Sequence, residues 1–297
     1  MRIAIASGKG GTGKTTLAAN LAHFLASGIN RKPETGKQPD VVLADLDVEE
    51  PNSGLFFAGT LKNQETKYKK VPKWNSEKCL LCGQCQEVCQ FHAILKLGES
   101  IMVFPELCHS CNACSGLCPT SSLPMTPVEI GKIREYQVEN LKFVEGRLLI
   151  GEEETVPLIK QTLEYLDNRF EGDSLFLLDS PPGTSCSVIE TVRAVDFVIL
   201  VGEPTPFGFH DFKLAAETLR ELDKEFYVVI NKDGVGNKEL EDYCRREDIK
   251  VIAKIPNSRR MAEVYSKGGL LYEEVPEFME NLQKVADFIL DYSAGEK

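Results

Sequence analysis

The strongest constraint on this sequence is a set of eight cysteines between Cys79 and Cys118. They form two runs with the same spacing, C-x2-C-x2-C-x3-C, and each cysteine of the first run has its counterpart 29 residues later. A repetition of this kind marks an internal repeat. Three closely spaced thiolates wrap one face of an iron–sulfur cubane, and the fourth cysteine of the run points towards a second cluster. The pattern therefore predicts two four-iron, four-sulfur (4Fe–4S) clusters.

The same spacing predicts which cysteines share a cluster, because the fourth cysteine of each run serves the other site. The first set consists of Cys79, Cys82, Cys85 and Cys118. The second set consists of Cys108, Cys111, Cys114 and Cys89. The segment resembles bacterial two-cluster ferredoxins over roughly 55 residues. One departure from their pattern is Gln90, which follows Cys89 where proline is expected.

Zinc and disulfides are the two alternatives for a cysteine-rich segment. Structural zinc sites use cysteine pairs separated by a longer loop. Two successive runs of four cysteines would supply more closely spaced ligands than such a site uses. Disulfide frameworks are typical of short secreted chains, whereas this chain has 297 residues and its first residues do not read as a signal peptide. We therefore expect metal binding in a reducing compartment, and a cytoplasmic location.

The N-terminal residues contain a phosphate-binding loop. Residues 8–15 read G-K-G-G-T-G-K-T, which matches G-x-x-x-x-G-K-S/T, and they lie between a predicted strand and a predicted helix. We expect Lys14 to reach the β- and γ-phosphates and Thr15 to ligate Mg²⁺. The nucleotide-binding residues predicted here are Gly8, Lys9, Gly10, Gly11, Thr12, Gly13, Lys14, Thr15 and Thr16.

Outside the cysteine segment, apolar strands alternate with helices. The predicted strands are 2–7, 41–44, 174–178, 196–201, 226–230 and 250–254. The predicted helices are 14–26, 186–195, 211–222, 238–247, 259–267 and 276–292. This alternation predicts an α/β fold with a parallel sheet covered on both faces. We predict a P-loop ATPase domain formed by residues 1–70 and 128–297, with a small α+β ferredoxin-like domain, residues 71–127, inserted after the second strand.

Lys9 places a second lysine ahead of the glycine pair Gly10 and Gly11. With it, the loop resembles the deviant Walker A family of ATPases, to which the MinD and Mrp proteins belong. Nearly the whole chain resembles a MinD-superfamily group that contains an inserted ferredoxin domain. The resemblance implies an ATP-sandwich homodimer in which Lys9 contacts the partner's phosphates and takes part in catalysis with Lys14. The alternative is that Lys9 is a surface charge.

The same resemblance implies roles for four further residues. Residues 45–49 look like the family's first switch, in which Asp47 would orient or deprotonate the attacking water and Asp45 would lie nearer Mg²⁺. Either aspartate could instead cap a strand end. Asp179 ends a strand that resembles Walker B and would hold Mg²⁺ through water. Asn231 belongs to an Asn-Lys pair similar to the family's adenine contact, and an incomplete N-K-x-D pattern favours ATP over GTP.

Cys186 and Cys244 lie outside the repeated runs. Cys186 follows Asp179 by seven residues, as does a cluster-binding cysteine of the nitrogenase iron protein, which this segment resembles. A bridging cluster of that type needs two cysteines per subunit, and Cys244 lies too late in the chain to be the second. The alternative is that Cys186 is a small buried hydrophobic residue at the start of a helix.

The charge of the chain limits the class of partner. Its net charge is −11, and two oxidised clusters would bring it to about −15. Such a surface repels nucleic acid and anionic lipid, so we expect neither as a partner. An acidic predicted C-terminal helix whose apolar stripe includes Phe278 and Leu282 is expected to pack on the core rather than on a membrane.

We therefore predict a slow ATPase that couples its nucleotide state to electron transfer through two 4Fe–4S clusters. Its partner would be a redox protein or an iron–sulfur client, and its donor and acceptor stay open. The main alternative is an iron–sulfur cluster scaffold or carrier ATPase of the Mrp type. That branch uses a C-x2-C pair near its C-terminus, which this chain lacks. A MinD-like positioning switch is a third possibility, disfavoured by the acidic C-terminal helix.

Overall fold

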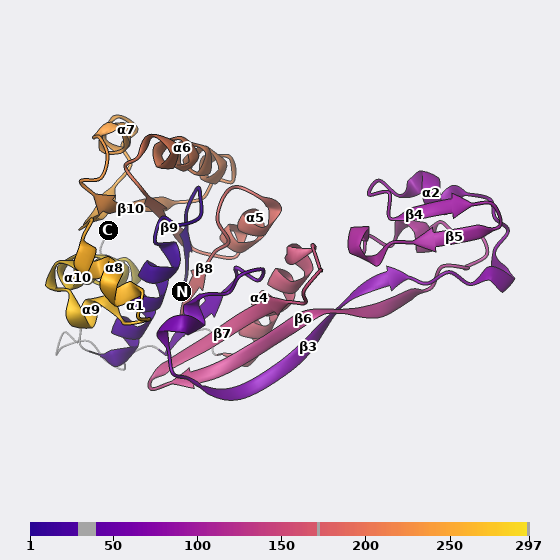
Figure 1. Ribbon diagram of the computed structural model, residues 1–297, viewed down its shortest axis with the longest axis horizontal. Helices are drawn as coiled ribbons and strands as arrows, with labels where there is room; N and C mark the ends of the chain where they lie inside the picture. The colour runs from indigo at the N-terminus through magenta and orange to yellow at the C-terminus, as the bar shows by residue number, and fades with distance from the viewer. Residues whose placement is uncertain (29–39, 171–172, 296–297) are drawn as a thin grey trace.

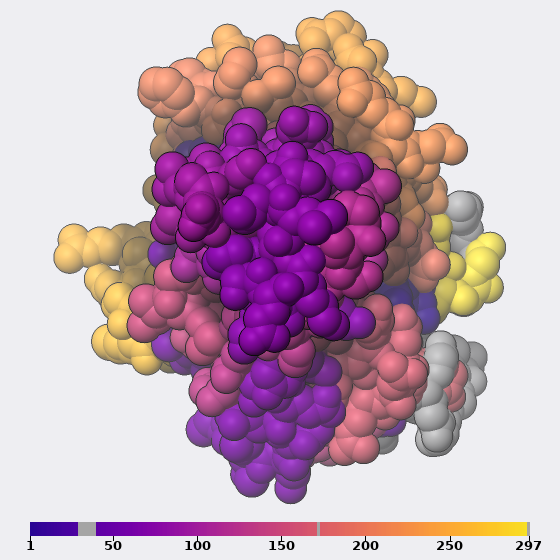
Figure 2. All heavy atoms as spheres, turned by 90° about the vertical axis from the view of Figure 1, so that its right-hand side faces the viewer, coloured from indigo at the N-terminus to yellow at the C-terminus, as the bar shows by residue number. Residues whose placement is uncertain are grey.

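A computed structural model describes residues 1–28, 40–170 and 173–295. The chain forms a large α/β body and a small distal unit, which are joined by a two-stranded ribbon (Figure 1). Viewed end-on in Figure 2, the distal unit stands in front of the body, and the outline of the body extends beyond it. No helix in the described ranges is long and apolar enough to cross a membrane.

The body is built on a nine-stranded sheet in the described residues, with strand order β11-β10-β9-β1-β8-β2-β7-β6-β3. Seven neighbouring strands from β11 to β7 run parallel. Their bounds are β1 Arg2–Ala6, β2 Val41–Asp45, β7 Leu141–Leu148, β8 Leu175–Asp179, β9 Phe197–Gly202, β10 Phe226–Asp233 and β11 Val251–Pro256. The central strands are almost wholly apolar and buried, as expected for a sheet covered on both faces.

Helices cover both faces of the sheet and create two apolar cores. Ile3 and Ile5 of β1 point into one core, whereas Ala4 and Ala6 point into the other, because side chains alternate along a strand. The first core contains α1 Lys14–Ser27, α8 Arg259–Tyr265, α9 Leu271–Glu274 and α10 Pro276–Ser293. The second contains α4 Thr155–Arg169, α5 Cys186–Arg193, α6 Pro206–Glu221 and α7 Glu239–Arg246. Phe278 and Leu282 of α10 are buried in the first core, which confirms the predicted packing of this helix.

The six predicted strands and six predicted helices are all present, with ends shifted by a few residues. The sheet was predicted to be parallel, but its strands are antiparallel at one edge. There β6 Met125–Val138 pairs antiparallel with both β7 and β3 Thr60–Pro72. These long strands were not predicted, because their charged and polar residues show no regular apolar alternation.

The distal unit, residues 73–124, is carried at the far end of the β3–β6 ribbon (Figure 1). It contains a hairpin of β4 Ile94–Leu97 and β5 Ser100–Val103 and the short helices α2 Gln84–Val88 and α3 Ala113–Gly116. Pro72 and Met125 are register partners, so the chain enters and leaves this unit at neighbouring positions. The distal unit lies inside the predicted inserted segment, 71–127, whose first and last residues belong to β3 and β6.

Candidate functional site

The phosphate-binding loop joins the buried strand β1 to the helix α1. Gly13 has a φ of 93°, which favours glycine, and a Cβ there would collide with the Asn231 amide. Gly8 does not line the nucleotide pocket; its missing side chain lets the loop pass against the backbone of Asp211 in α6. The loop thus needs glycine at these two positions for different reasons.

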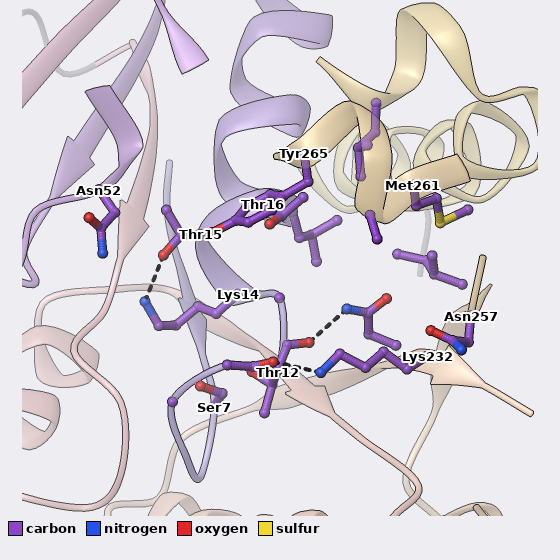
Figure 3. A pocket seen from close by; sticks show the side chains of 18 of the residues that line it. Ser7, Thr12, Lys14, Thr15, Thr16, Asn52, Lys232, Asn257, Met261 and Tyr265 are labelled. Carbon is purple, nitrogen blue, oxygen red and sulfur yellow. Dashed lines mark hydrogen bonds between the residues drawn. The ribbon is translucent and has the colours of Figure 1, made fainter. Parts of the chain in front are cut away.

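A pocket of about 500 Å³ opens over this loop. Figure 3 shows Lys14 and Asn52 on one side of the pocket and Lys232 and Asn257 on the other. Lys9, Gly10, Gly11, Thr12, Gly13, Lys14, Thr15 and Thr16, all predicted to bind nucleotide, line it together. The hydroxyl of Thr12 is buried and has no hydrogen-bond partner in the described structure. A buried polar atom without a partner is costly, so this hydroxyl is suited to meet a polar ligand.

Two fully buried carboxylates lie beneath the pocket. Asp45 ends β2 and Asp179 ends β8, and the two residues are register partners in adjacent parallel strands. Lys14 Nζ lies 2.7 Å from Asp179 Oδ1. Ser53 joins the two carboxylates: its backbone N–H donates to Asp45 Oδ2 at 2.9 Å, and its hydroxyl donates to Asp179 Oδ2 at 3.1 Å. Asp45 and Asp179, which were both predicted to lie near Mg²⁺, are therefore neighbours. Thr15, the third residue of that prediction, lines the pocket.

The electrostatics of this carboxylate pair follow from its burial. Burial raises the pKa of Asp45 to about 7, and the negative charge of Asp179 adds to the rise. Asp47 is half-buried and lines the pocket, and burial raises its pKa to about 6 although Lys14 acts against the shift. Asp47 therefore lines the pocket with a raised pKa, and its role in activating water stays a prediction.

Glu203 is a buried residue of this site that the sequence analysis missed. Its carboxylate accepts from Lys9 Nζ at 3.3 Å and from Lys232 Nζ at 2.8 Å. Burial acts to raise the pKa of Glu203, but the bonds from Lys232, Thr205 and Lys9 outweigh it and lower the pKa. Glu203 directly follows the apolar strand β9, at the same sheet edge as Asp179. This position after a buried strand is the sequence feature that could have identified Glu203 as a site residue. Ser53 gave no comparable signal, because it belongs to no motif.

Asn231 lies in β10 and lines the pocket, and its amide donates to the carbonyl of Thr12 at 2.7 Å. In the described structure this side chain therefore fixes the phosphate-binding loop, and its contact with adenine stays a prediction. Met261 and Tyr265 of α8 line the pocket as well and add apolar surface to it. Sequence reasoning missed both residues because neither belongs to a motif: Met261 is an ordinary buried position of a helix, and Tyr265 is an exposed one.

The distal unit contains two small cavities, each lined by four cysteines. We call them cage 1 and cage 2. Cage 1 is lined by Cys79, Cys82, Cys85 and Cys118. Cage 2 is lined by Cys89, Cys108, Cys111 and Cys114. The structure therefore groups the eight cysteines in the two sets that the spacing predicted, including the exchange of Cys89 and Cys118 between the runs.

The two cages differ in their surroundings. Cys82 of cage 1 and Cys111 of cage 2 are exposed, whereas Cys108 and Cys114 are buried. Burial raises the pKa of Cys114 to about 11. Burial also acts to raise the pKa of Cys118, but hydrogen bonds from Ser122 and Thr120 outweigh it and lower the pKa to about 7. All ten cysteines lie in the described ranges, and none of them forms a disulfide there.

Cys186 is the first residue of α5 and is exposed, so the alternative that it is a buried hydrophobic residue is wrong. Its exposure reflects its place at the helix start, before the buried residues Val188 and Val192. Cys244 is 1% exposed and packs in the second core of the body, away from the distal unit. The structure does not bring these two cysteines together.

Comparisons with known proteins agree with this geometry. Residues 3–271 match the family described as CobQ/CobB/MinD/ParA nucleotide binding domain. The chain is 30% identical over 293 residues to an uncharacterized protein of Methanocaldococcus jannaschii, covering 95% of this chain and 96% of that one. Its fold is similar to the septum site-determining protein MinD from Pyrococcus horikoshii, solved with Mg-ADP, with a TM-score of 0.59 and 17% identity over 100% of this chain and 98% of the other.

A shorter stretch of the chain has a different relative. It is 35% identical over 51 residues to an uncharacterized ferredoxin of Methanocaldococcus jannaschii, which covers 16% of this chain and 66% of that protein.

Proposed function

Because the chain belongs to the CobQ/CobB/MinD/ParA nucleotide-binding family, we propose that it is an ATP-dependent iron–sulfur protein. ATP binding and slow hydrolysis in the body would control electron transfer through two 4Fe–4S clusters in the distal unit. The observation that carries this proposal is the pair of four-cysteine cages attached to a nucleotide-binding body.

Several features of the body support binding of a magnesium nucleotide. Lys14 and Thr15 line the pocket where phosphates would lie, and Asp45 and Asp179 lie beneath it. Backbone N–H groups of a glycine loop and the start of α1 favour anions. Nearby, Asp47 has a carboxylate positioned to orient water. These groups fit phosphoryl transfer to water, which relies on positioning and charge stabilisation.

The cysteine cages fit clusters better than they fit single metal ions. The described residues contain no group of three or more His, Cys, Asp or Glu side chains placed to hold one ion. A cubane requires a wider arrangement, because each of its four irons takes one thiolate and the thiolates stand around an inorganic core. Residues of both cages share an apolar cluster with Trp74, whose indole N–H is buried and without a hydrogen-bond partner. Such an N–H could donate to a cluster sulfur.

When bound, 4Fe–4S clusters supply reversible one-electron transfer. The protein holds each cluster site with four thiolates, shields Cys108 and Cys114 from solvent and leaves Cys82 and Cys111 at the surface. Exposed cysteines give a redox partner a short approach to each cage. Four protein ligands per site also disfavour release of a cluster, so the carrier function of the Mrp type is the weaker proposal.

The proposal includes a homodimer, a redox protein partner and a cytoplasmic location. In an ATP-sandwich dimer, Lys9 would leave Glu203 and contact the nucleotide of the partner subunit. The bond between Lys9 and Glu203 is long, at 3.3 Å, and the Lys9 side chain is 29% exposed. A partly exposed lysine can change partners at modest cost.

Anaerobic purification followed by iron, sulfide and nucleotide analysis tests the proposal. We expect eight irons and eight sulfides per chain, ATP binding, and a change in cluster reduction potential when a non-hydrolysable ATP analogue is added. The variant Cys186→Ser is a matched control, because it removes an exposed cysteine outside the cages. Zinc in place of iron, or cluster potentials indifferent to nucleotide, would refute the proposed coupling.

A further inference from the structure

A buried ion pair connects the ribbon to the body. Lys69 of β3 places its Nζ 2.6 Å from Glu152 Oε1, and the two side chains are 1% and 10% exposed. On the same strand, Lys67 and Lys70 are half-buried or exposed. Burying an ion pair requires the loss of hydration of both charges, so it is weak evidence for a contribution to stability.

Lys69 lies next to cage 2. Its neighbour Lys70 accepts a hydrogen bond from Ser110 Oγ at 2.7 Å through its carbonyl. Val71 packs against Cys108, and Val128, the register partner of Lys69, packs in the same apolar cluster. These contacts place Lys69 beside the cysteines of cage 2.

The body contacts cage 2 at a second point of the same segment. Glu154 Oε1 lies 2.8 Å from His109 Nε2. His109 lines cage 2 and stacks on Phe91, with 3.7 Å between the ring centroids. Residues 149–154 thus present two carboxylates to the cage, one to Lys69 and one to His109.

This segment begins directly beside the nucleotide site. The backbone N–H of Leu148, the last residue of β7, donates to the carbonyl of Val48 at 2.9 Å. Val48 follows Asp47, which lines the nucleotide pocket. Glu152 lies four residues beyond Leu148, so only a short length of chain separates the partner of Lys69 from the strand end that is bonded to Val48.

We propose that Lys69 sets the reduction potential of the cluster held in cage 2, and that the nucleotide-binding body adjusts this effect through Glu152. The inference rests on the proposed function, because it requires a cluster in that cage. One electron from a low-potential donor adds one negative charge to the cage. A nearby buried cation stabilises that charge, and a carboxylate paired with the cation weakens the effect.

Potentiometric titration of the full chain, followed by electron paramagnetic resonance, tests this inference. Lys69→Gln should make the cage 2 potential more negative, and Glu152→Gln should make it less negative. We expect about a tenfold change in the reduction equilibrium, which is about 59 mV for one electron. Cage 1 should not change. Lys67→Gln is the matched control, because Lys67 pairs with Glu65 at 2.7 Å on the same strand but outside the junction.

Opposite shifts from the two partners distinguish an electrostatic role from a structural one. A lysine that only supports the fold would give no shift, or equal shifts in both variants, and either result would overturn the inference. Lys69→Arg keeps the charge and should keep the potential, which provides a second variant if Lys69→Gln fails to fold. The potential change caused by an ATP analogue should be lost in Glu152→Gln, and its persistence would refute the role of Glu152. Iron content measured on the same samples shows whether a failure lies with the proposed clusters instead.

Discussion

Lys14 and Asp179 form a buried ion pair, with 2.7 Å between Nζ and Oδ1 and side-chain exposures of 6% and 0%. Lys14 is therefore paired with a residue that is expected to face magnesium. Lys14 would have to break this ion pair in order to bind the phosphates of a nucleotide. Binding of Mg-ATP would then exchange one partner of each residue: Lys14 would turn to phosphate, and Asp179 to the hydrated metal ion.

Lys14→Ala should abolish nucleotide binding and should also destabilise the nucleotide-free protein. Removing one member of a buried ion pair leaves the other charge without compensation, which costs about 3–5 kcal/mol. Urea unfolding without nucleotide measures this loss. Lys9→Ala is the control, since the Lys9 side chain is partly exposed and its removal should change the free energy of unfolding much less. Equal stability of Lys14→Ala and wild type would show that the pair is unimportant without ligand.

Asp45→Asn should stabilise the metal-free protein at alkaline pH. The pKa of Asp45 is raised to about 7 in the folded state by burial and by Asp179, so the folded protein binds a proton more tightly than the unfolded chain does. Stability from this group is full below its unfolded pKa and is lost as pH rises through about 7. The melting temperature of Asp45→Asn should exceed that of wild type at pH 8, and the difference should shrink at pH 5. A difference independent of pH would contradict this account.

Asp47→Asn should retain ATP binding and lower turnover by about 10²–10⁴-fold, because an amide cannot accept a proton from water. Wild-type turnover should also fall as pH decreases through about 6, where Asp47 becomes protonated. Initial rates between pH 5 and pH 8 measure both effects. Glu49→Gln is the control, as Glu49 is exposed two residues away. Normal turnover by Asp47→Asn would move the catalytic role to another residue.

Cys118→Ser should damage the cluster in cage 1 and leave the cluster in cage 2 intact, although Cys118 lies nearer in sequence to Cys114. The reason is that Cys118 lines the cavity formed with Cys79, Cys82 and Cys85. Iron analysis and electron paramagnetic resonance of the anaerobic protein report which signal disappears. Loss of the cage 2 signal would show that the two sets had been assigned incorrectly.

Lys9→Ala should weaken ATP-dependent dimerisation while retaining nucleotide binding by the monomer. Lys9 lines the pocket from a partly exposed position, held by Glu203. Light scattering with and without a non-hydrolysable ATP analogue measures the association. Lys238→Ala, which removes an exposed lysine elsewhere on the body, provides the comparison. If both variants dimerise like wild type, the ATP-sandwich arrangement loses its support.

The sequence was most informative where chemistry fixes spacing. The cysteine sets were predictable because one cubane imposes a distinct pattern on its four ligands, and β1 and α1 were predictable because a phosphate loop needs a strand and a helix around it. The β3–β6 ribbon was not predictable from apolar periodicity, since β3 carries Lys62, Lys67 and Lys70 along a largely exposed edge. Charged edge strands of this kind protect a sheet from unwanted pairing.

Contacts between segments that are distant in the chain also could not be predicted from the sequence. Ser53 meets Asp179 across 126 positions of the chain, and Lys69 meets Glu152 across 83. A single serine or lysine has no pattern that reveals such a partner. These contacts depend on the sheet order, which brings β2, β7 and β8 side by side and attaches the ribbon at the edge.

The pairing of Pro72 with Met125 makes the distal unit modular. Both ends of the insertion leave the sheet at one point, so the host strands β3 and β6 keep their register whether 52 residues or a tight turn connects them. A lineage could thus acquire or discard such a unit by changing a single hairpin connection, with every other strand retaining its neighbour. The nucleotide-binding body and the distal unit are therefore joined in a way that allows each to be inherited without the other.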